Sequence, residues 1–310
     1  MHDLPAIEPR GGDPRGEDAR EAASFEVLRP EAQSLPLVVA SPHSGRAYPE
    51  AFLAASRLSP LDLRRSEDSF VDEIFLGAVK LGAPLLRALF PRAYVDPNRE
   101  PYELDPAMFA GPLPDYVNRR SPRVSAGLGT IARVVANGAE IYREPLDFAE
   151  ALARIERHYW PYHAALKDLV EQTRAAFGCC ILLDCHSMPS SNDVNPDSDG
   201  KRPRGPKALD VVLGNCHGAA CAPRVTDSVA ATLERLGYSV GRNVPYSGGF
   251  VTRHYGRPEA GLHSLQIEIN RALYMDEEEI TRKSGLRFLA EQMNEVVRAL
   301  GEIPPETLRP

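Results

Sequence analysis

Two histidines, each following an apolar and β-prone run, are the residues of this chain best suited to metal chemistry. His43 follows the run at 37–40 in the segment SPHSG, and His186 follows the run at 181–183 in the segment DCHS. In an open α/β sheet, ligands gather at the carboxyl ends of strands. Two such histidines with a carboxylate between them in sequence are typical of a His/carboxylate/His metal site with an open position for water. The pattern predicts hydrolysis; the alternative is two buried histidines with structural hydrogen bonds.

The carboxylate of this site is expected in the segment 66–72, which contains three acids. If Ser69 is the N-cap of a helix, Asp72 lies at the third helical position and completes a capping box. Asp68 then lies in the preceding loop, free to point at a metal, and Glu67 is the alternative ligand. A further interpretation is that both acids only interact with the positive end of the helix. The spacing leaves these alternatives open.

A second group of residues is suited to binding a carboxylate. Asn98 and Arg99 follow a predicted strand at 93–95 and open a loop at 97–122 that is dense in Pro, Asn and Asp. An amide next to a planar guanidinium suits a carboxylate ligand, and long loops in compact domains are usually functional. Arg92, at the start of the same strand, is another fixed cation. The alternative for each arginine is a solvated surface position.

The segment GGFVTRHYG is predicted to contact the substrate. Gly248 and Gly249 allow close approach of the backbone to a ligand, and Thr252, Arg253 and His254 follow them. For His254, a substrate contact is favoured over a third metal ligand or a structural role. A phosphate site is disfavoured because the chain has no GxxxxGK[ST] pattern.

Glu268 is the candidate general base. It lies in a predicted strand at 265–269, where alternation places it on the face opposite Ile267 and Ile269. A carboxylate in a partly dry cleft can have a raised pKa and accept a proton. The alternative is a glutamate on a half-exposed strand face.

The elements that must position these residues alternate between strands and helices, which predicts an α/β sandwich with a mixed, mostly parallel sheet. Asn137-Gly138 predicts a hairpin between 130–135 and 139–142. Further strands are expected at 37–40, 85–90, 180–183 and 211–213. Helices are expected at 70–79, 147–176 with an interruption near Pro161, 226–236 and 277–300.

Composition is typical of an ordinary soluble globular protein. The 310 residues are 43% hydrophobic and 25% charged, and the net charge of −7 argues against a nucleic-acid binder. The apolar runs are too short for a membrane span, and the N-terminus does not resemble a secretory signal. We expect a disordered tail at 1–24, one catalytic domain at 25–310 and a mobile surface loop at 189–206. The odd number of cysteines and the absence of a CxxC pair favour a reducing cytoplasm over a disulfide framework or a zinc site: Cys179, Cys180, Cys185, Cys216 and Cys221. The first three lie in or beside an apolar strand and are expected to be core residues.

From about Pro36 to Met275 the chain resembles the N-formylglutamate amidohydrolase family. The similar segments occur in one order: PHSG, SEDSFVD, RAYVDPNRE, NGAEIYREPL, WPYHAAL, DCHSMPS, VVLGN, PYSGGFVTRHYG and LQIEINRALYMDE. The family is distantly similar to zinc carboxypeptidases and aspartoacylases. The resemblance therefore implies a three-layer α/β/α fold around a mixed sheet.

The resemblance also implies roles for the residues above. His43, Asp68 and His186 would bind Zn²⁺ or another divalent metal, Glu268 would be catalytic, and Asn98 with Arg99 would hold a substrate carboxylate. Arg92 lies close to the position where aspartoacylases place an arginine on the scissile carbonyl, although the spacing is not identical.

The expected reaction is hydrolysis of a small N-acyl amino acid, with N-formyl-L-glutamate as the leading candidate. A glutamate side chain would need a second cation, for which Arg253 and Arg257 are the candidates. The alternatives are a zinc peptidase acting on peptides or cell-wall fragments, and a catalytically silent binding protein.

Overall fold

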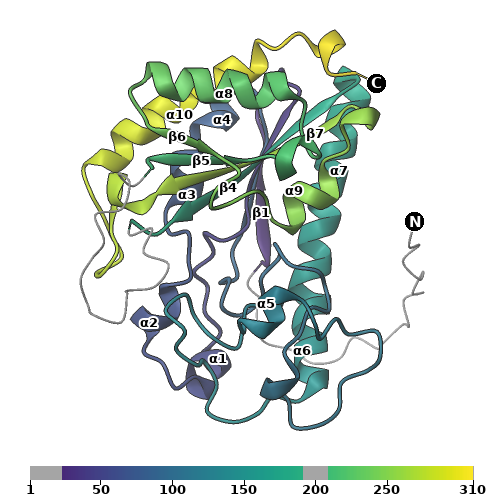
Figure 1. The fold of residues 1–310 in the computed structure, drawn as a ribbon, viewed down its shortest axis with the longest axis vertical. Helices are drawn as coiled ribbons and strands as arrows, with labels where there is room; N and C mark the ends of the chain where they lie inside the picture. The colour runs from purple at the N-terminus through teal and green to yellow at the C-terminus, as the bar shows by residue number, and fades with distance from the viewer. Residues whose placement is uncertain (1–22, 191–208, 310) are drawn as a thin grey trace.

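A seven-stranded mixed sheet forms the centre of the molecule (Figure 1). The computed structural model describes residues 23–190 and 209–309. The strand order is β1-β3-β2-β4-β7-β5-β6. The neighbouring pairs β3–β2, β2–β4 and β4–β7 are parallel, whereas β1 is antiparallel to β3 and β5 is antiparallel to β7. The strands are β1 (Phe25–Leu28), β2 (Leu37–Ser41), β3 (Leu85–Ala88), β4 (Cys180–Met188), β5 (Val211–Gly214), β6 (Val240–Arg242) and β7 (Leu262–Asn270).

Helices cover one face of the sheet, and alternate strand residues point toward them. Leu37 and Val39 of β2 belong to this core, whereas Val38 and Ala40 belong to the core on the other face. The covering helices are α3 (Val71–Ile74), α4 (Gly77–Lys80), α8 (Pro223–Arg235) and α10 (Gly285–Gly301) (Figure 1).

The other face is covered by α7 (Trp160–Phe177) and α9 (Phe250–Tyr255), together with long connections that extend well beyond the sheet (Figure 1). These connections build a loop-rich layer, defined here as residues 42–66 and 89–147. It contains α1 (Glu50–Ala55), α2 (Pro60–Arg64) and α5 (Pro122–Ser125), and α6 (Phe148–Arg154) follows it in sequence. The three-layer α/β/α arrangement and the mostly parallel sheet confirm the expected fold class.

Most predicted strands are present, but the one at 93–95 is wrong. Those residues form a turn in which the Tyr94 amide donates to Pro91 O at 2.9 Å. The predicted hairpin at 130–142 is reduced to one antiparallel bridge, Val134 to Glu140, because these segments lie in the loop-rich layer rather than at a sheet edge. The predicted strand at 180–183 extends to Met188, so His186 lies within β4 rather than after it.

The capping box at Ser69 is also wrong. Phe70, in the left-handed conformation at φ 68°, precedes the first helical residue of α3, and the Ser69 hydroxyl donates to Glu67 Oε2 at 2.7 Å. Asp72 instead pairs with Arg87 at 2.8 Å. The predicted helix at 70–79 is split into α3 and α4.

The C-terminal helix begins at Gly285 rather than at 277, because the short strands β8 (Met275–Asp276) and β9 (Thr281–Arg282) pair first. The interruption predicted near Pro161 is a π-helical turn at Ile155–Tyr159, between α6 and α7. The tail predicted at 1–24 and the loop predicted at 189–206 fall mainly on 1–22 and 191–208, outside the described residues.

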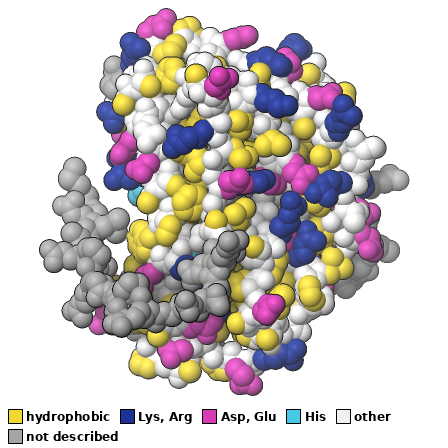
Figure 2. Space-filling model, turned by 180° about the vertical axis from the view of Figure 1, so that it is seen from behind, with side chains coloured by type: hydrophobic (Ala, Val, Ile, Leu, Met, Phe, Trp, Pro, Cys, Tyr) yellow, Lys and Arg dark blue, Asp and Glu magenta, His cyan; other side chains and the backbone are white. Residues whose placement is uncertain are grey.

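The five cysteines are unpaired, and all except Cys216 are buried, which agrees with a role in the core. No helix in the described ranges is long and apolar enough to cross a bilayer. Acidic and basic side chains are interspersed over the face shown in Figure 2.

Arg154 of α6 ties the loop-rich layer to the helices. Its side chain is buried, donates from Nη1 to the Tyr142 hydroxyl at 2.8 Å, and pairs with Glu150. The guanidinium carbon lies 4.3 Å from the ring centre of Tyr94 and also packs against Phe52. A buried cation between aromatic faces is a strong local interaction.

We predict that Arg154→Ala lowers the free energy of unfolding by roughly 2–4 kcal/mol, because it removes a charged hydrogen bond and a desolvated cation–π contact. Chemical denaturation measures the change. Arg287→Ala is the control, because the Arg287 side chain is 90% exposed and its one ion pair within the described residues is with Glu291 on the surface of α10. Equal losses in the two variants would contradict an anchoring role for Arg154.

Candidate active site

A cavity of about 330 Å³ lies at the carboxyl ends of β2, β4 and β7, between the sheet and the loop-rich layer. His43 follows β2, His186 lies near the end of β4, and Glu268 lies near the end of β7. Two of these strands fix the geometry directly, because His186 and Glu268 are register partners in the β4–β7 ladder. The sheet thus places three side chains along one edge, as parallel strands do in open α/β folds.

His43, Asp68 and His186 bring three ligand atoms together. His43 Nδ1 lies 3.2 Å from Asp68 Oδ2, His186 Nδ1 lies 3.0 Å from the same oxygen, and the two Nδ1 atoms are 3.1 Å apart. All three side chains are buried. Atoms at these separations can each lie about 2.0–2.1 Å from one zinc-sized ion. The three residues could therefore hold a metal.

The contacts of the outer ring nitrogens leave the two Nδ1 atoms able to act as acceptors when both imidazoles are neutral. His43 Nε2 donates to Asp96 Oδ1 at 2.8 Å, and His186 Nε2 donates to Asp184 Oδ1 at 3.0 Å. A carboxylate can only accept, so each neutral imidazole carries its proton on Nε2 and a lone pair on Nδ1. Two lone pairs and the Asp68 oxygen then face one another. This arrangement fits a bound cation, and carboxylate partners behind ligating histidines are characteristic of metal sites.

The electrostatics of the cluster also favour positive charge. Burial lowers the pKa of His186, but Asp184 and Asp68 outweigh burial and raise that pKa well above its usual value. Burial raises the pKa of Asp68, but hydrogen bonds with His186 and His43 hold it well below its usual range.

Asp68 rather than Glu67 reaches this cluster. Glu67 is buried on the other side of the same segment, where it accepts from Tyr48 at 2.8 Å and from Arg64 at 3.1 Å. The second oxygen of Asp68 accepts from Arg271 at 3.1 Å. The alternatives left open by the sequence therefore have a geometric answer: Glu67 is occupied by structural contacts, and Asp68 faces the histidines.

Glu268 lies on the cavity face of β7, as alternation predicts, while Ile267 and Ile269 belong to the opposite core. Its Oε1 accepts from Gln266 Nε2 at 2.9 Å. Burial raises the pKa of Glu268 to about 7, with Asp68 adding to the rise and His186 opposing it. A carboxylate with a pKa near neutrality is suited to accepting and returning a proton.

Arg92 and Arg99 both line the cavity and share Asp96. Arg92 Nε donates to Asp96 Oδ2 at 3.0 Å, and Arg99 Nη2 lies 3.5 Å from the same oxygen. Arg99 also donates to the backbone carbonyls of Leu128 and Asn98, at 2.9 and 2.8 Å. Among the described residues, the terminal nitrogens of Arg92 have no hydrogen-bond partner, so Arg92 has more free donors than Arg99.

Gly248 and Gly249 line the cavity next to Asn98. A Cβ on Gly249 would lie 2.4 Å from the Asn98 amide, and Asn98 Oδ1 accepts from the Val251 amide at 2.8 Å. Gly249 therefore leaves room for the Asn98 side chain. Its amide nitrogen lies 3.1 Å from His186 Nε2.

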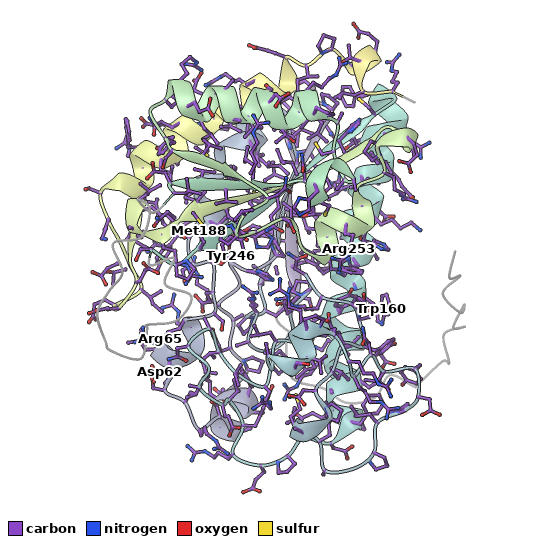
Figure 3. The ribbon with its side chains drawn as sticks, viewed as in Figure 1. Asp62, Arg65, Trp160, Met188, Tyr246 and Arg253 are labelled. Carbon is purple, nitrogen blue, oxygen red and sulfur yellow. The ribbon has the colours of Figure 1, made fainter. Side chains whose placement is uncertain are left out.

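Three other predicted contact residues do not line the cavity. Thr252 is buried and donates to Asp184 at 3.2 Å, so it acts behind His186. Arg253 and His254 are exposed on α9. In Figure 3 the labelled Arg253 lies well apart from Tyr246, which lines the cavity. Arg257, the other candidate second cation, is also exposed and outside the cavity.

The sequence interpretation missed several residues that the structure places at the site: Asp96, Asp184, Arg123, Tyr246, Gln266 and Arg271. For two of these residues the sequence contained a signal. Asp184 and Gln266 each lie two residues from a predicted site residue on a strand, and therefore on the same face. Arg123 and Tyr246 come from loop segments whose approach depends on the tertiary fold.

Comparison with known proteins shows the family of this chain. The model of the N-formylglutamate amidohydrolase family matches residues 35–275. The chain belongs to this family. Its members are hydrolases that cleave an amide C–N bond, and so is this protein.

N-formylglutamate deformylases of Pseudomonas aeruginosa and Pseudomonas putida are 31% and 29% identical to it, and each alignment covers 82% of this chain and 87% of the relative. The crystal structure of N-formylglutamate amidohydrolase from Ralstonia eutropha JMP134 is 38% identical, with a TM-score of 0.83 over 92% of this chain and 99% of that chain. A structure from Agrobacterium tumefaciens, at 21% identity and a TM-score of 0.61, covers 91% of this chain and 98% of that chain and shows the same fold.

We predict that Asp184→Asn weakens metal binding by about 10- to 100-fold, because the amide no longer fixes the proton of His186 on Nε2. His186→Ala, which removes a ligand atom, should abolish binding. Metal content after dialysis against a graded chelator series measures both effects. Asp227→Asn, a change of the same type on the exposed surface of α8, is the control. Full metal retention in the His186 variant would rule out the assigned ligand set.

Proposed function

We propose that this protein hydrolyses a small N-acyl amino acid, with N-formyl-L-glutamate as the leading substrate and formate and L-glutamate as products. The observation that carries this proposal is the convergence of three acceptor atoms beside Glu268, in a cavity that also contains arginine donors. Membership of the N-formylglutamate amidohydrolase family and the names of the Pseudomonas relatives support this substrate.

Zn²⁺ is the proposed metal, because two imidazoles and one carboxylate with room for water suit zinc. Bound at His43, Asp68 and His186, it would lower the pKa of water and polarise the substrate carbonyl. The unpaired cysteine thiols support the further proposal that the protein works in a reducing compartment, the cytoplasm.

The residues of the chain supply the other steps. Glu268 accepts a proton from the attacking water as the new C–O bond forms at the acyl carbon. When the C–N bond breaks, Glu268 returns this proton to the leaving nitrogen, so the base is regenerated. The free terminal nitrogens of Arg92 would stabilise the negative charge that develops on the carbonyl oxygen.

Asn98 and Arg99 are proposed to hold the α-carboxylate of the substrate. Both line the cavity next to His186 and Asp96. Because their positions are fixed by Val251 and by two backbone carbonyls, they would present donors with little reorganisation on binding. Gly248 and Gly249 would allow the substrate to approach the backbone.

We expect Glu268→Gln to bind metal normally and to lose about 10²- to 10⁴-fold in kcat on N-formyl-L-glutamate, because the amide cannot accept the proton. Metal analysis and single-turnover kinetics measure the two properties separately. Glu279→Gln, an exposed position after β8, is the control and should leave both properties unchanged. Wild-type turnover in the Glu268 variant would reduce this residue to a structural role.

The substrate class is tested with a panel of N-formyl amino acids, N-acetyl amino acids and short peptides, using protein depleted of metal and then reloaded with Zn²⁺. We expect turnover of the free N-formyl amino acid, and only in the reloaded protein. Preferential cleavage of peptides would support a peptidase instead. No bound metal and no turnover of any compound would indicate a binding protein.

A further inference from the structure

Four arginines line the cavity, and they differ in how far their donors are already engaged. Arg271 contacts Ser187, Asp68 and two backbone carbonyls. Arg99 is bound to two backbone carbonyls and lies beside Asp96, and Arg92 uses only its Nε. Among the residues that the structure describes, Arg123 has no hydrogen bond, ion pair or ring contact through its guanidinium.

The backbone around Arg123 is held in place although its side chain is exposed. The Arg123 carbonyl accepts from the amides of Leu128 and Ala126, at 2.8 and 3.1 Å. The Ser121 hydroxyl caps this short turn by accepting from the Val124 amide at 3.0 Å. The guanidinium is therefore attached to a fixed point on the cavity wall, and its donors remain available to a ligand.

The acids of the cavity do not neutralise this arginine. Asp68 is engaged by the two histidines and by Arg271, and Glu268 accepts from Gln266. The positive charges also act on one another. The pKa of Arg99 is lowered to about 10, mainly by burial and also by the charges of Arg92 and Arg123, while Asp96 opposes the fall. An anion brought by the ligand would relieve this repulsion.

We propose that Arg123 binds the side-chain carboxylate of the substrate and is the residue that distinguishes N-formyl-L-glutamate from N-acyl amino acids with a neutral side chain. This inference rests on the proposed function, in which Asn98 and Arg99 hold the α-carboxylate near the metal ligands. A second carboxylate on the same small molecule would then face the exposed wall that contains Arg123. The planar guanidinium can bind it through two parallel hydrogen bonds.

The experiment compares three substrates that differ by one carboxylate. They are N-formyl-L-glutamate, N-formyl-L-glutamine with a neutral side chain, and N-formyl-L-isoglutamine with a neutral α-position. Each is assayed with the wild-type protein, Arg123→Gln, Arg123→Lys and the control Arg120→Gln. Arg120 is also exposed, lies three residues away in sequence and does not line the cavity.

We expect Arg123→Gln to lower kcat/KM on N-formyl-L-glutamate by about 10- to 100-fold, the loss expected for hydrogen bonds between charged groups. The value of kcat/KM on N-formyl-L-isoglutamine should fall as much, because this substrate keeps the side-chain carboxylate. On N-formyl-L-glutamine it should change by less than about twofold. Arg123→Lys should be intermediate because it keeps the charge but loses the planar donor pair. Arg120→Gln should match the wild type on all three substrates.

Two outcomes overturn the assignment to Arg123. If Arg123→Gln lowers kcat/KM equally on all three substrates, or on none of them, Arg123 does not recognise the substrate side chain. If the loss disappears for N-formyl-L-isoglutamine instead of N-formyl-L-glutamine, Arg123 holds the α-carboxylate. Both results leave the proposed hydrolysis standing.

A binding measurement separates this inference from the proposed function. Calorimetric titration of the metal-loaded protein with L-glutamate and with L-glutamine should show that Arg123→Gln weakens only the glutamate complex, again by about 10- to 100-fold. If the wild type cleaves none of the substrates, the proposed function is wrong. In that case, loss of glutamate selectivity in the variant still supports the Arg123 site, and unchanged selectivity rejects it.

Discussion

The convergence of His43, His186 and Asp68 on one point is the constraint on which the rest of the site depends. Acceptor atoms do not gather at about 3 Å unless their orientations are fixed from behind. Asp96 and Asp184 hold the two imidazoles, and Ser187 with Arg271 holds the outer oxygen of Asp68. Each of these partners is itself buried. The cluster is therefore prepared by a shell of hydrogen bonds rather than by the flexibility of its own side chains.

Asp96 links the proposed metal side of the cavity to its substrate side. One carboxylate oxygen of Asp96 accepts from His43 and from the backbone amide of Asn98. The other oxygen accepts from Arg92 and lies near Arg99. Burial raises the pKa of Asp96, but Arg99, His43 and Arg92 together hold it well below its usual range. A single carboxylate thus sets the position of a candidate ligand and of the two arginines proposed to contact the substrate.

The sequence predicted those parts of the site that depend on local regularity. Apolar runs located β2, β4 and β7, and alternation placed Glu268 on the face opposite Ile267 and Ile269. It failed where distant segments decide the structure. The segment 93–95 looked like a strand because its residues are apolar or aromatic, yet it forms a turn in which Tyr94 packs under Arg154 from a helix 60 residues later. For the same reason the partnership of Asp96 with His43, 53 residues apart in sequence, gave no local signal.

β4 and β7 pair at nine positions, so changes in the sheet and changes in the loops have different consequences for this enzyme. His186 and Glu268 are held side by side by a buried ladder, in which a shift of one residue would turn both side chains to the other face. The arginines of the cavity, apart from Arg271, come from the loop-rich layer, where insertions and substitutions are tolerated more easily. Divergence of relatives toward new substrates can therefore proceed through residues 89–147, while the spacing between Glu268 and His186 is inherited unchanged with the sheet.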